Sequence, residues 1–122
     1  PADVEGAVAY AYWRQAQGQI DPLSNLENTP VLLFNGENDW TVYTRVMRDT
    51  LRQLEAFANR DGLAGRFRTG AAHVWSLDHG GCSCGTCVDQ GASRVCCDVN
   101  NCDYDLSGDL LRHIYGTELQ PP

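Results

Sequence analysis

Two side chains in this sequence are spaced as an acid and a base that could act together in catalysis. Asp39 closes the stretch VLLFNGEND, in which an apolar run stops and turn-forming residues follow, and His73 lies in TGAAHVW, after the next candidate strand. The carboxyl ends of neighbouring parallel strands share one edge of a sheet, so we expect these side chains to meet. A carboxylate on one imidazole nitrogen fixes the other nitrogen as a proton acceptor, which is what an adjacent nucleophile requires.

Structural interpretations of the same residues remain open. NGENDW is rich in residues that bond their own backbone in turns, so Asp39 could be a turn residue only. The other histidines are His79, beside a turn, and His113, within the last predicted helix. A single histidine is more often structural than catalytic. The pairing with Asp39 favours the catalytic hypothesis for His73.

A nucleophile for this pair is not evident. No serine stands in a Gly-x-Ser-x-Gly elbow or follows a strong strand. The serines are Ser24, Ser76, Ser83, Ser93 and Ser107. The cysteines are crowded together, which favours pairing over a reactive free thiolate. The sequence thus predicts an acid and a base without their nucleophile.

The elements that must position these residues alternate between helix and strand. Helical spacing predicts helices over 3–17 and 41–59, and a continuous apolar run predicts a buried strand over 31–35. A weaker strand is expected over 65–70, then a long loop over 71–105 without periodicity. Ser107 is expected to cap a final helix that reaches about Tyr115. This order is typical of an α/β architecture, but two strands are too few for a doubly wound sheet.

The composition restricts the possible partners. The net charge is −7 and all nine cationic residues are arginines, so no basic patch for nucleic acid is expected. No apolar stretch approaches the length of a membrane span. We expect no cofactor. The first residue is Pro1 rather than methionine, which suggests a mature, cleaved or truncated product.

The six cysteines lie within one short segment and could be disulfides or metal ligands. They are Cys82, Cys84, Cys87, Cys96, Cys97 and Cys102. Their even number and density favour three disulfides and an oxidising compartment, and the connectivity is open among fifteen possibilities. Zinc held by thiolates, with His79 near enough in sequence to join, is the alternative. Paired Cys-x-x-Cys motifs are absent, so we expect no metal.

Three stretches resemble one enzyme family. IDPLSNLENTPVLLFNGENDWTVY (20–43), AAHVW (71–75) and NNCDYDLSGDLLRHIYG (100–116) are together similar to the C-terminal part of extracellular polyhydroxybutyrate depolymerase-like esterases. Those enzymes are α/β-hydrolases with a Ser-His-Asp triad. The resemblance implies that Asp39 is the acid and His73 the histidine. It also implies that the serine precedes both, on a chain or segment upstream of Pro1.

The resemblance leads to one functional expectation and leaves alternatives. We expect residues 1–122 to be the C-terminal part of one α/β-hydrolase domain, in a secreted serine esterase acting on polyhydroxyalkanoate or related acyl esters. Trp40 and Trp75 adjoin the proposed catalytic residues, and either line an apolar cleft for the substrate or pack in the core. The other hypotheses are a non-catalytic, disulfide-rich module derived from a hydrolase and a zinc-binding module.

Overall fold

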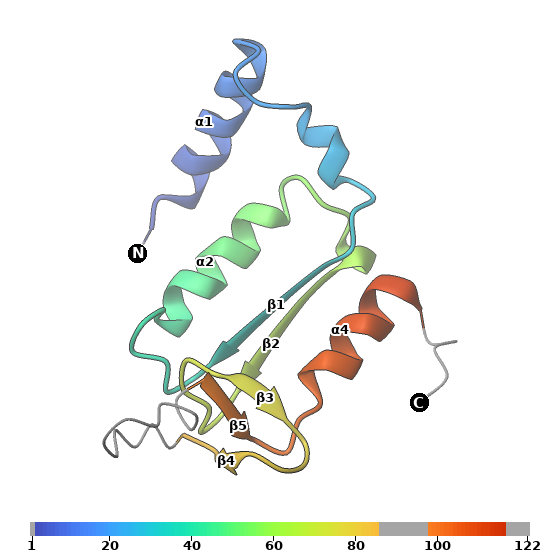
Figure 1. The fold of residues 1–122 in the computed structure, drawn as a ribbon. Helices are drawn as coiled ribbons and strands as arrows, with labels where there is room; N and C mark the ends of the chain where they lie inside the picture. The colour runs from blue at the N-terminus through green and yellow to red at the C-terminus, as the bar shows by residue number, and fades with distance from the viewer. Residues whose placement is uncertain (1, 86–97, 117–122) are drawn as a thin grey trace. The chain divides into compact units, whose positions relative to one another are not determined.

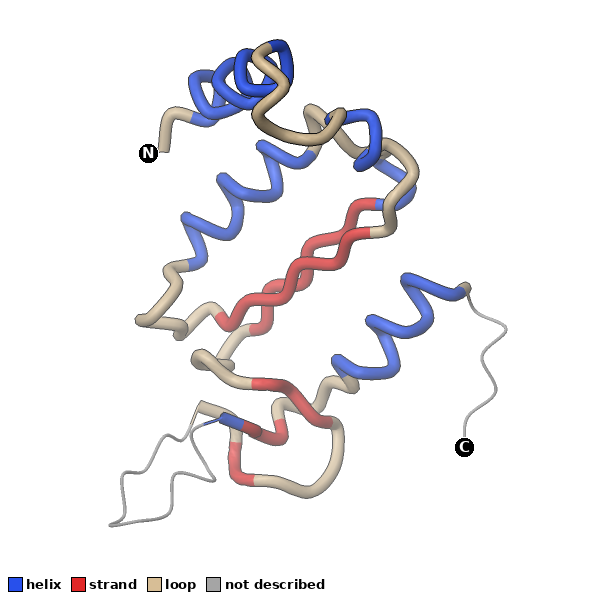
Figure 2. Tube along the Cα trace, turned by 45° about the horizontal axis from the view of Figure 1, so that its top comes forward, coloured by secondary structure: helices blue, strands red, loops and turns tan. Residues whose placement is uncertain are grey.

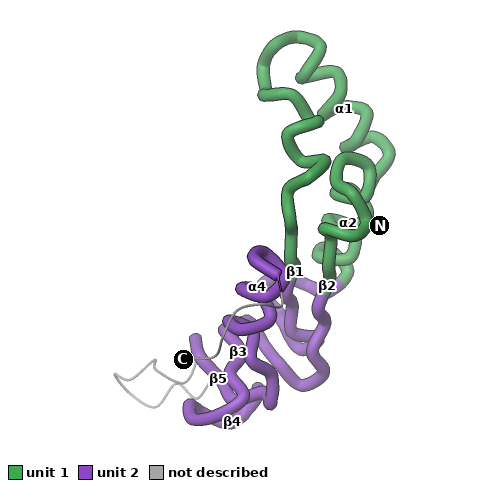
Figure 3. The backbone as a smooth tube through the Cα atoms, turned by 90° about the vertical axis from the view of Figure 1, so that its right-hand side faces the viewer, with its two compact units in different colours: residues 1–33, 45–65 green, residues 34–44, 66–122 purple. Residues whose placement is uncertain are grey.

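The computed structural model describes residues 2–85 and 98–116. The chain forms two compact units, residues 1–33 with 45–65 and residues 34–44 with 66–122 (Figure 3). The elements in chain order are α1 (Val4–Ala16), the 3-10 turn η1 (Leu23–Leu26), β1 (Val31–Gly36), α2 (Thr44–Leu54), the 3-10 turn η2 (Arg60–Gly62), β2 (Leu63–Arg68), β3 (Trp75–Leu77), β4 (Cys82–Ser83), β5 (Val99–Asn101) and α4 (Leu106–Tyr115) (Figure 1).

The predicted order of the four main elements before the cysteine-rich segment is confirmed. The strands β1 and β2 are hydrogen-bonded neighbours that run side by side (Figure 2), and their arrows point in the same direction in Figure 1. The predicted helix over 41–59 is too long, because α2 covers only Thr44–Leu54. Its start is delayed because the backbone amides of Thr41 and Val42 are bound by the Asp39 carboxylate in a turn.

In the first unit, α1 covers Val4–Ala16 and so lies within the predicted range 3–17. The Asp3 side chain accepts a hydrogen bond from the Gly6 amide at the first turn, and Gly18 follows the helix with a φ of 66°. The ring of Tyr12 meets that of Phe57 edge to face, with centroids 5.6 Å apart. No α1 residue is fully buried, so this helix is held by partial contacts along one side.

In the second unit, the predicted loop over 71–105 is wrong, because short strands lie within it. β5 lies between β3 and β4 and is parallel to both. Ser76 of β3 and Cys82 of β4 both pair with Asn100, and Ser76 and Asn100 are fully buried. Strands of two or three residues are too short for side-chain alternation to be recognised in a sequence.

The beginning of α4 also differs from the prediction. Asp105, rather than Ser107, caps the helix by accepting a hydrogen bond from the Gly108 amide at 2.8 Å. A polar network then ties the helix to β2: Asp109 binds Arg66 Nε at 2.8 Å and accepts from the Tyr104 hydroxyl. Burial and the bond to Asp109 raise the pKa of Tyr104 to about 12. This network fixes the second unit around the carboxyl end of β2.

Disulfides are confirmed where the cysteines can be observed. Cys84 is bonded to Cys102, and Cys82 is also disulfide-bonded. Cys87, Cys96 and Cys97 lie outside the described residues, so their predicted pairing stays a prediction. Among residues 2–85 and 98–116, no three histidine, cysteine, aspartate or glutamate side chains are grouped to hold a metal ion. Cys82, Cys84 and Cys102 are therefore not available as zinc-binding thiolates.

No helix in the described part of the chain combines the length and the apolar character needed to cross a membrane.

Candidate active site

Asp39 and His73 are in direct contact within the second unit. Nδ1 of the His73 ring lies 2.9 Å from Oδ2 of Asp39. The Asp39 side chain is only 4% exposed, whereas that of His73 is 61% exposed. The contact uses Nδ1, which leaves Nε2 as the ring nitrogen available to a reacting group. The structure therefore brings together the two residues that were paired on sequence grounds.

The two oxygens of the Asp39 carboxylate have different partners. Oδ1 accepts hydrogen bonds from the amides of Thr41 and Val42, each at 2.8 Å. The Asp39 amide in turn donates to the Gly36 carbonyl at 3.1 Å. Asp39 is thus a turn residue, as the structural interpretation has it, and it also presents its second oxygen to His73. The turn holds the carboxylate in the orientation that the histidine contact needs.

The hydrogen bonds around Asp39 keep it ionised. Burial acts to raise the pKa of this carboxyl, but hydrogen bonds from the Val42 amide, the His73 ring and the Thr41 amide hold it below its ordinary value. A carboxylate that is ionised at neutral pH can stabilise the positive charge that His73 gains when it takes a proton.

Asn35 is a component of the site that the sequence reasoning missed. It is the last side chain of β1 before Gly36 and is 3% exposed. Its Nδ2 donates to Asp39 Oδ2 at 3.2 Å and to the Val42 carbonyl at 2.9 Å. The available signal was its position, because a polar residue directly after VLLF lies where a buried apolar side chain would be expected.

A close backbone approach positions the segment that carries His73. The amide of Asn38 donates to the carbonyl of the fully buried Ala71 at 2.9 Å. Gly36 faces the same segment, and a Cβ at this position would lie 2.2 Å from the Ala71 oxygen and 2.4 Å from the Ala72 oxygen. Only glycine permits this approach, so Gly36 sets the separation between Asp39 and His73.

Replacement of Gly36 with alanine is therefore expected to displace residues 71–73. We predict a loss of about 1–3 kcal/mol in the free energy of unfolding, because backbone atoms must move to admit the methyl group. Urea unfolding measures this loss. Gly62→Ala is the matched control, since its Cβ would lie 3.6 Å from the Thr29 carbonyl oxygen, at ordinary contact distance. Equal stability losses in the two variants would contradict the role of Gly36.

The two tryptophans are placed at the surface of the second unit. Trp40 is 79% exposed and meets Tyr43 edge to face, with ring centroids 6.1 Å apart. Trp75 is 44% exposed, and its Nε1 donates to the Ser107 hydroxyl oxygen at 3.0 Å. The interpretation of these rings as core residues is therefore wrong for Trp40, and Trp75 is only partly buried. A substrate-binding role for either ring stays a prediction.

The other histidines are arranged differently from His73. His79 is 91% exposed and contacts the carboxylate of its neighbour Asp78, on the chain segment just before β4. His113 lies in the last turn of α4. An acid at the adjacent position on an open surface holds an imidazole far less firmly than the buried Asp39 does.

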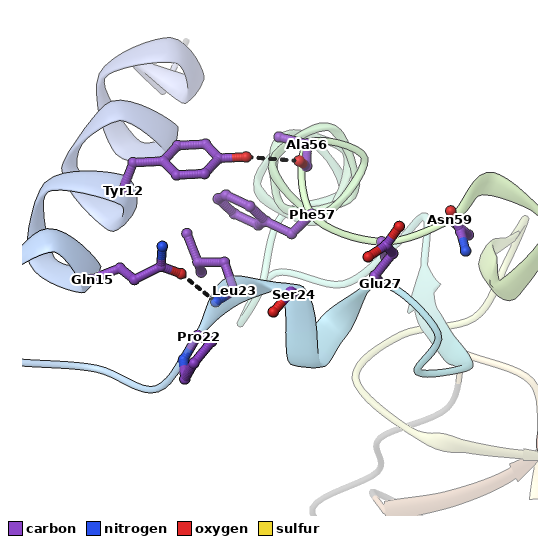
Figure 4. Close-up of a pocket in the computed structure, with 10 residues that line it drawn as sticks. Tyr12, Gln15, Pro22, Leu23, Ser24, Glu27, Ala56, Phe57 and Asn59 are labelled. Atoms are coloured by element: carbon purple, nitrogen blue, oxygen red, sulfur yellow. Dashed lines mark hydrogen bonds between the residues drawn. The ribbon is translucent and has the colours of Figure 1, made fainter. Parts of the chain in front are cut away.

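Described residues of each unit line a hollow. In the first unit, a cavity of about 430 Å³ lies between α1, η1 and the segment after α2 (Figure 4). Its lining includes the Tyr12 hydroxyl, which donates to the Ala56 carbonyl, and Gln15, which accepts from the Leu23 amide. In the second unit, a hollow of about 510 Å³ lies beside the Cys84–Cys102 disulfide. Neither is lined by Asp39 or His73.

Comparison with known proteins relates this chain to one group of enzymes. No family model matches it. The chain is 34% identical over 102 residues to the poly(3-hydroxybutyrate) depolymerase of Delftia acidovorans, and 30% identical over 99 residues to the polyhydroxybutyrate depolymerase of Talaromyces funiculosus. These matches cover 84% and 81% of this chain but only 19% and 28% of the relatives, so the chain spans less than a third of their length.

Solved structures give the same result for the fold. A crystal structure of the PHB depolymerase from Penicillium funiculosum superposes with a TM-score of 0.71 at 30% identity, covering 84% of this chain and 31% of that one. A serine-to-alanine variant of a PHB depolymerase, complexed with R3HB trimer, gives a TM-score of 0.69 at 30% identity, covering 81% and 30%. The predicted fold class is confirmed: the chain has the fold of a portion of an α/β-hydrolase-like enzyme.

Proposed function

We propose that this relative of the polyhydroxybutyrate depolymerases is the C-terminal part of a serine-type carboxylic ester hydrolase, and that it supplies the acid and the histidine of the triad. The observation that carries the proposal is the 2.9 Å contact between Asp39 Oδ2 and His73 Nδ1, with the carboxylate buried and the ring exposed. Homologues named as depolymerases favour polyhydroxyalkanoates or related acyl esters as substrates.

The proposed mechanism assigns one task to each group. A serine on another chain or segment attacks the ester carbonyl, and Nε2 of His73 takes its proton. The alkoxide of the substrate leaves with that proton, and the acyl group stays on the serine as an ester. Water then attacks this ester while Nε2 of His73 takes the proton of the water, and the serine leaves with that proton as the acid is released. Asp39 keeps the proton of His73 on Nδ1 and stabilises the imidazolium while it exists. Because Nδ1 faces the buried carboxylate, only Nε2 is left to face the serine.

The serine is proposed to lie outside residues 1–122. Ser76 is fully buried and donates to the Tyr104 carbonyl at 2.9 Å, and Ser107 accepts from Trp75. The chain corresponds to less than a third of its relatives, which leaves room for a serine-bearing segment in the whole enzyme. We also propose that the enzyme is extracellular, since disulfides such as Cys84–Cys102 persist in oxidising compartments.

Labelling of the whole enzyme with a fluorophosphonate tests this proposal. The probe forms a covalent bond with an activated serine, and peptide mass spectrometry locates it. We expect one labelled serine in a Gly-x-Ser-x-Gly peptide that is not part of residues 1–122, and no labelling after His73→Ala. Absence of labelling in the unsubstituted enzyme would favour the alternative, a disulfide-rich module without catalysis. Labelling of a serine within residues 1–122 would contradict the proposed split of the triad.

A further inference from the structure

We infer that Asn35 is a positioning residue that holds the Asp39 carboxylate toward His73; this inference rests on the proposed function. The side chain of Asn35 is buried at the end of β1 and lies between Asp39 and Val42. The hydrogen bonds of its side chain go to Asp39 and Val42, and none goes to the imidazole. It acts on His73 only through the carboxylate.

The orientation of the Asn35 amide is determined by its neighbours. Nδ2 faces two acceptors, Asp39 Oδ2 at 3.2 Å and the Val42 carbonyl at 2.9 Å. A flipped amide would place its oxygen against both of these oxygens, so the nitrogen must occupy this position. Asp39 Oδ2, the oxygen that contacts His73, therefore also accepts a hydrogen bond from Asn35 Nδ2.

The oxygen of the same amide is in an unfavourable environment. Oδ1 of Asn35 is buried and has no hydrogen-bond partner among the described residues. An unpaired buried acceptor destabilises a fold by about 1–3 kcal/mol, so packing alone would favour an apolar residue after VLLF. An amide at this position is explained if its donor is needed for the geometry of Asp39.

The amide also complements the turn at Asp39. The Thr41 and Val42 amides hold Oδ1, and Asn35 and His73 share Oδ2. Without Asn35, Oδ2 would keep only the exposed His73 as a partner. The turn would still hold Oδ1, but Oδ2 could tilt away from its present position about those hydrogen bonds. This tilt would misdirect the imidazole and lower kcat, while the binding of substrate would be little affected.

The test compares variants of the whole enzyme in ester hydrolysis. Asn35→Leu removes the donor at similar volume, and we expect kcat to fall by about 10- to 100-fold, as for other groups that orient a reacting residue through a second one. KM is expected to stay within about twofold, because uniform binding of substrate is unchanged. Rates are expressed per mole of folded enzyme, and thermal unfolding of each preparation shows that it is folded.

Asn100→Leu is the matched control. Asn100 is also an asparagine at 0% exposure, and it lies in β5 of the same unit. We expect its kcat per mole of folded enzyme to remain close to that of the unsubstituted enzyme, even if its stability falls. Equal kcat in Asn35→Leu and Asn100→Leu, with His73→Ala inactive, would overturn the inference and leave the proposed function standing.

Asn35→Asp supplies a readout that a purely structural role would not affect. Its new carboxyl would lie against the Asp39 carboxylate, and two such groups share a proton at low pH. The protonated form can still donate to Asp39 Oδ2, whereas the ionised form repels it. We therefore expect kcat, relative to the unsubstituted enzyme, to fall as pH rises. A ratio that does not vary with pH would overturn the inference, and activity retained in His73→Ala would overturn the proposed function instead.

Discussion

Replacement of His73 with alanine in the whole enzyme is expected to lower kcat for a short acyl ester by at least about 10⁴-fold. The physical reason is that the serine hydroxyl would lose its proton acceptor, and the leaving alkoxide would lose its proton donor. Steady-state hydrolysis of a chromogenic acyl ester measures this effect. Thermal unfolding of the same preparation shows whether the variant is folded, which is expected because the His73 side chain is 61% exposed.

His113→Ala and His79→Ala are the controls for this experiment. His79 is paired with the adjacent Asp78 at the surface, and His113 lies at the end of α4. Both variants are expected to retain kcat within about twofold, because neither imidazole contacts Asp39 in the proposed mechanism. Loss of activity in His113→Ala with retention in His73→Ala would exclude the assignment of the catalytic base.

Asp39→Asn is expected to have the second-largest effect, a loss of about 10³–10⁴-fold in kcat. The asparagine oxygen can still accept from the Thr41 and Val42 amides, so the turn is preserved. The new NH₂ group then faces the Asn35 amide nitrogen and His73 Nδ1, and donors meet donors. The imidazole must present an unprotonated Nδ1 to this group, which places its proton on Nε2, where it cannot accept one from serine.

The matched control for Asp39→Asn is Glu37→Gln. Glu37 lies in the same turn and is exposed, and its carboxylate accepts from the Thr69 hydroxyl at 2.7 Å. The two substitutions make the same change from carboxylate to amide two residues apart. Kinetics on the same ester are expected to show full activity for Glu37→Gln. Comparable losses in both variants would indicate that the charge of the turn matters, rather than the contact of Asp39 with His73.

The contact between Asp39 and His73 could be predicted from the sequence, because the carboxyl ends of neighbouring parallel strands lie at the same edge of a sheet. The sequence was also sufficient for α1, whose apolar residues recur at helical spacing, and for β1, which is a continuous apolar run. The weaker strand was expected over 65–70, whereas β2 covers Leu63–Arg68. The resemblance to depolymerase-like esterases rested on the residues around those elements. The comparisons with known enzymes extend over more than four-fifths of the chain.

The features that were not predicted depend on contacts between distant residues. The strands β3, β4 and β5 are too short to have a period, and they are recognisable only by their mutual pairing. Ser107 was predicted to cap α4, whereas the observed cap is Asp105, whose carboxylate accepts a hydrogen bond from the Gly108 amide. The function of Asn35 follows from a hydrogen bond to Asp39 across the turn, which composition and spacing do not encode.

The central claim is that Asp39 contributes to catalysis through His73, and the double variant Asp39→Asn/His73→Ala tests it most directly. Residues that act as one unit have strongly non-additive effects. We predict that kcat of the double variant equals that of His73→Ala alone, because Asp39 has no further task once the imidazole is absent. A double variant whose loss equals the product of the two single losses would contradict this account of the site.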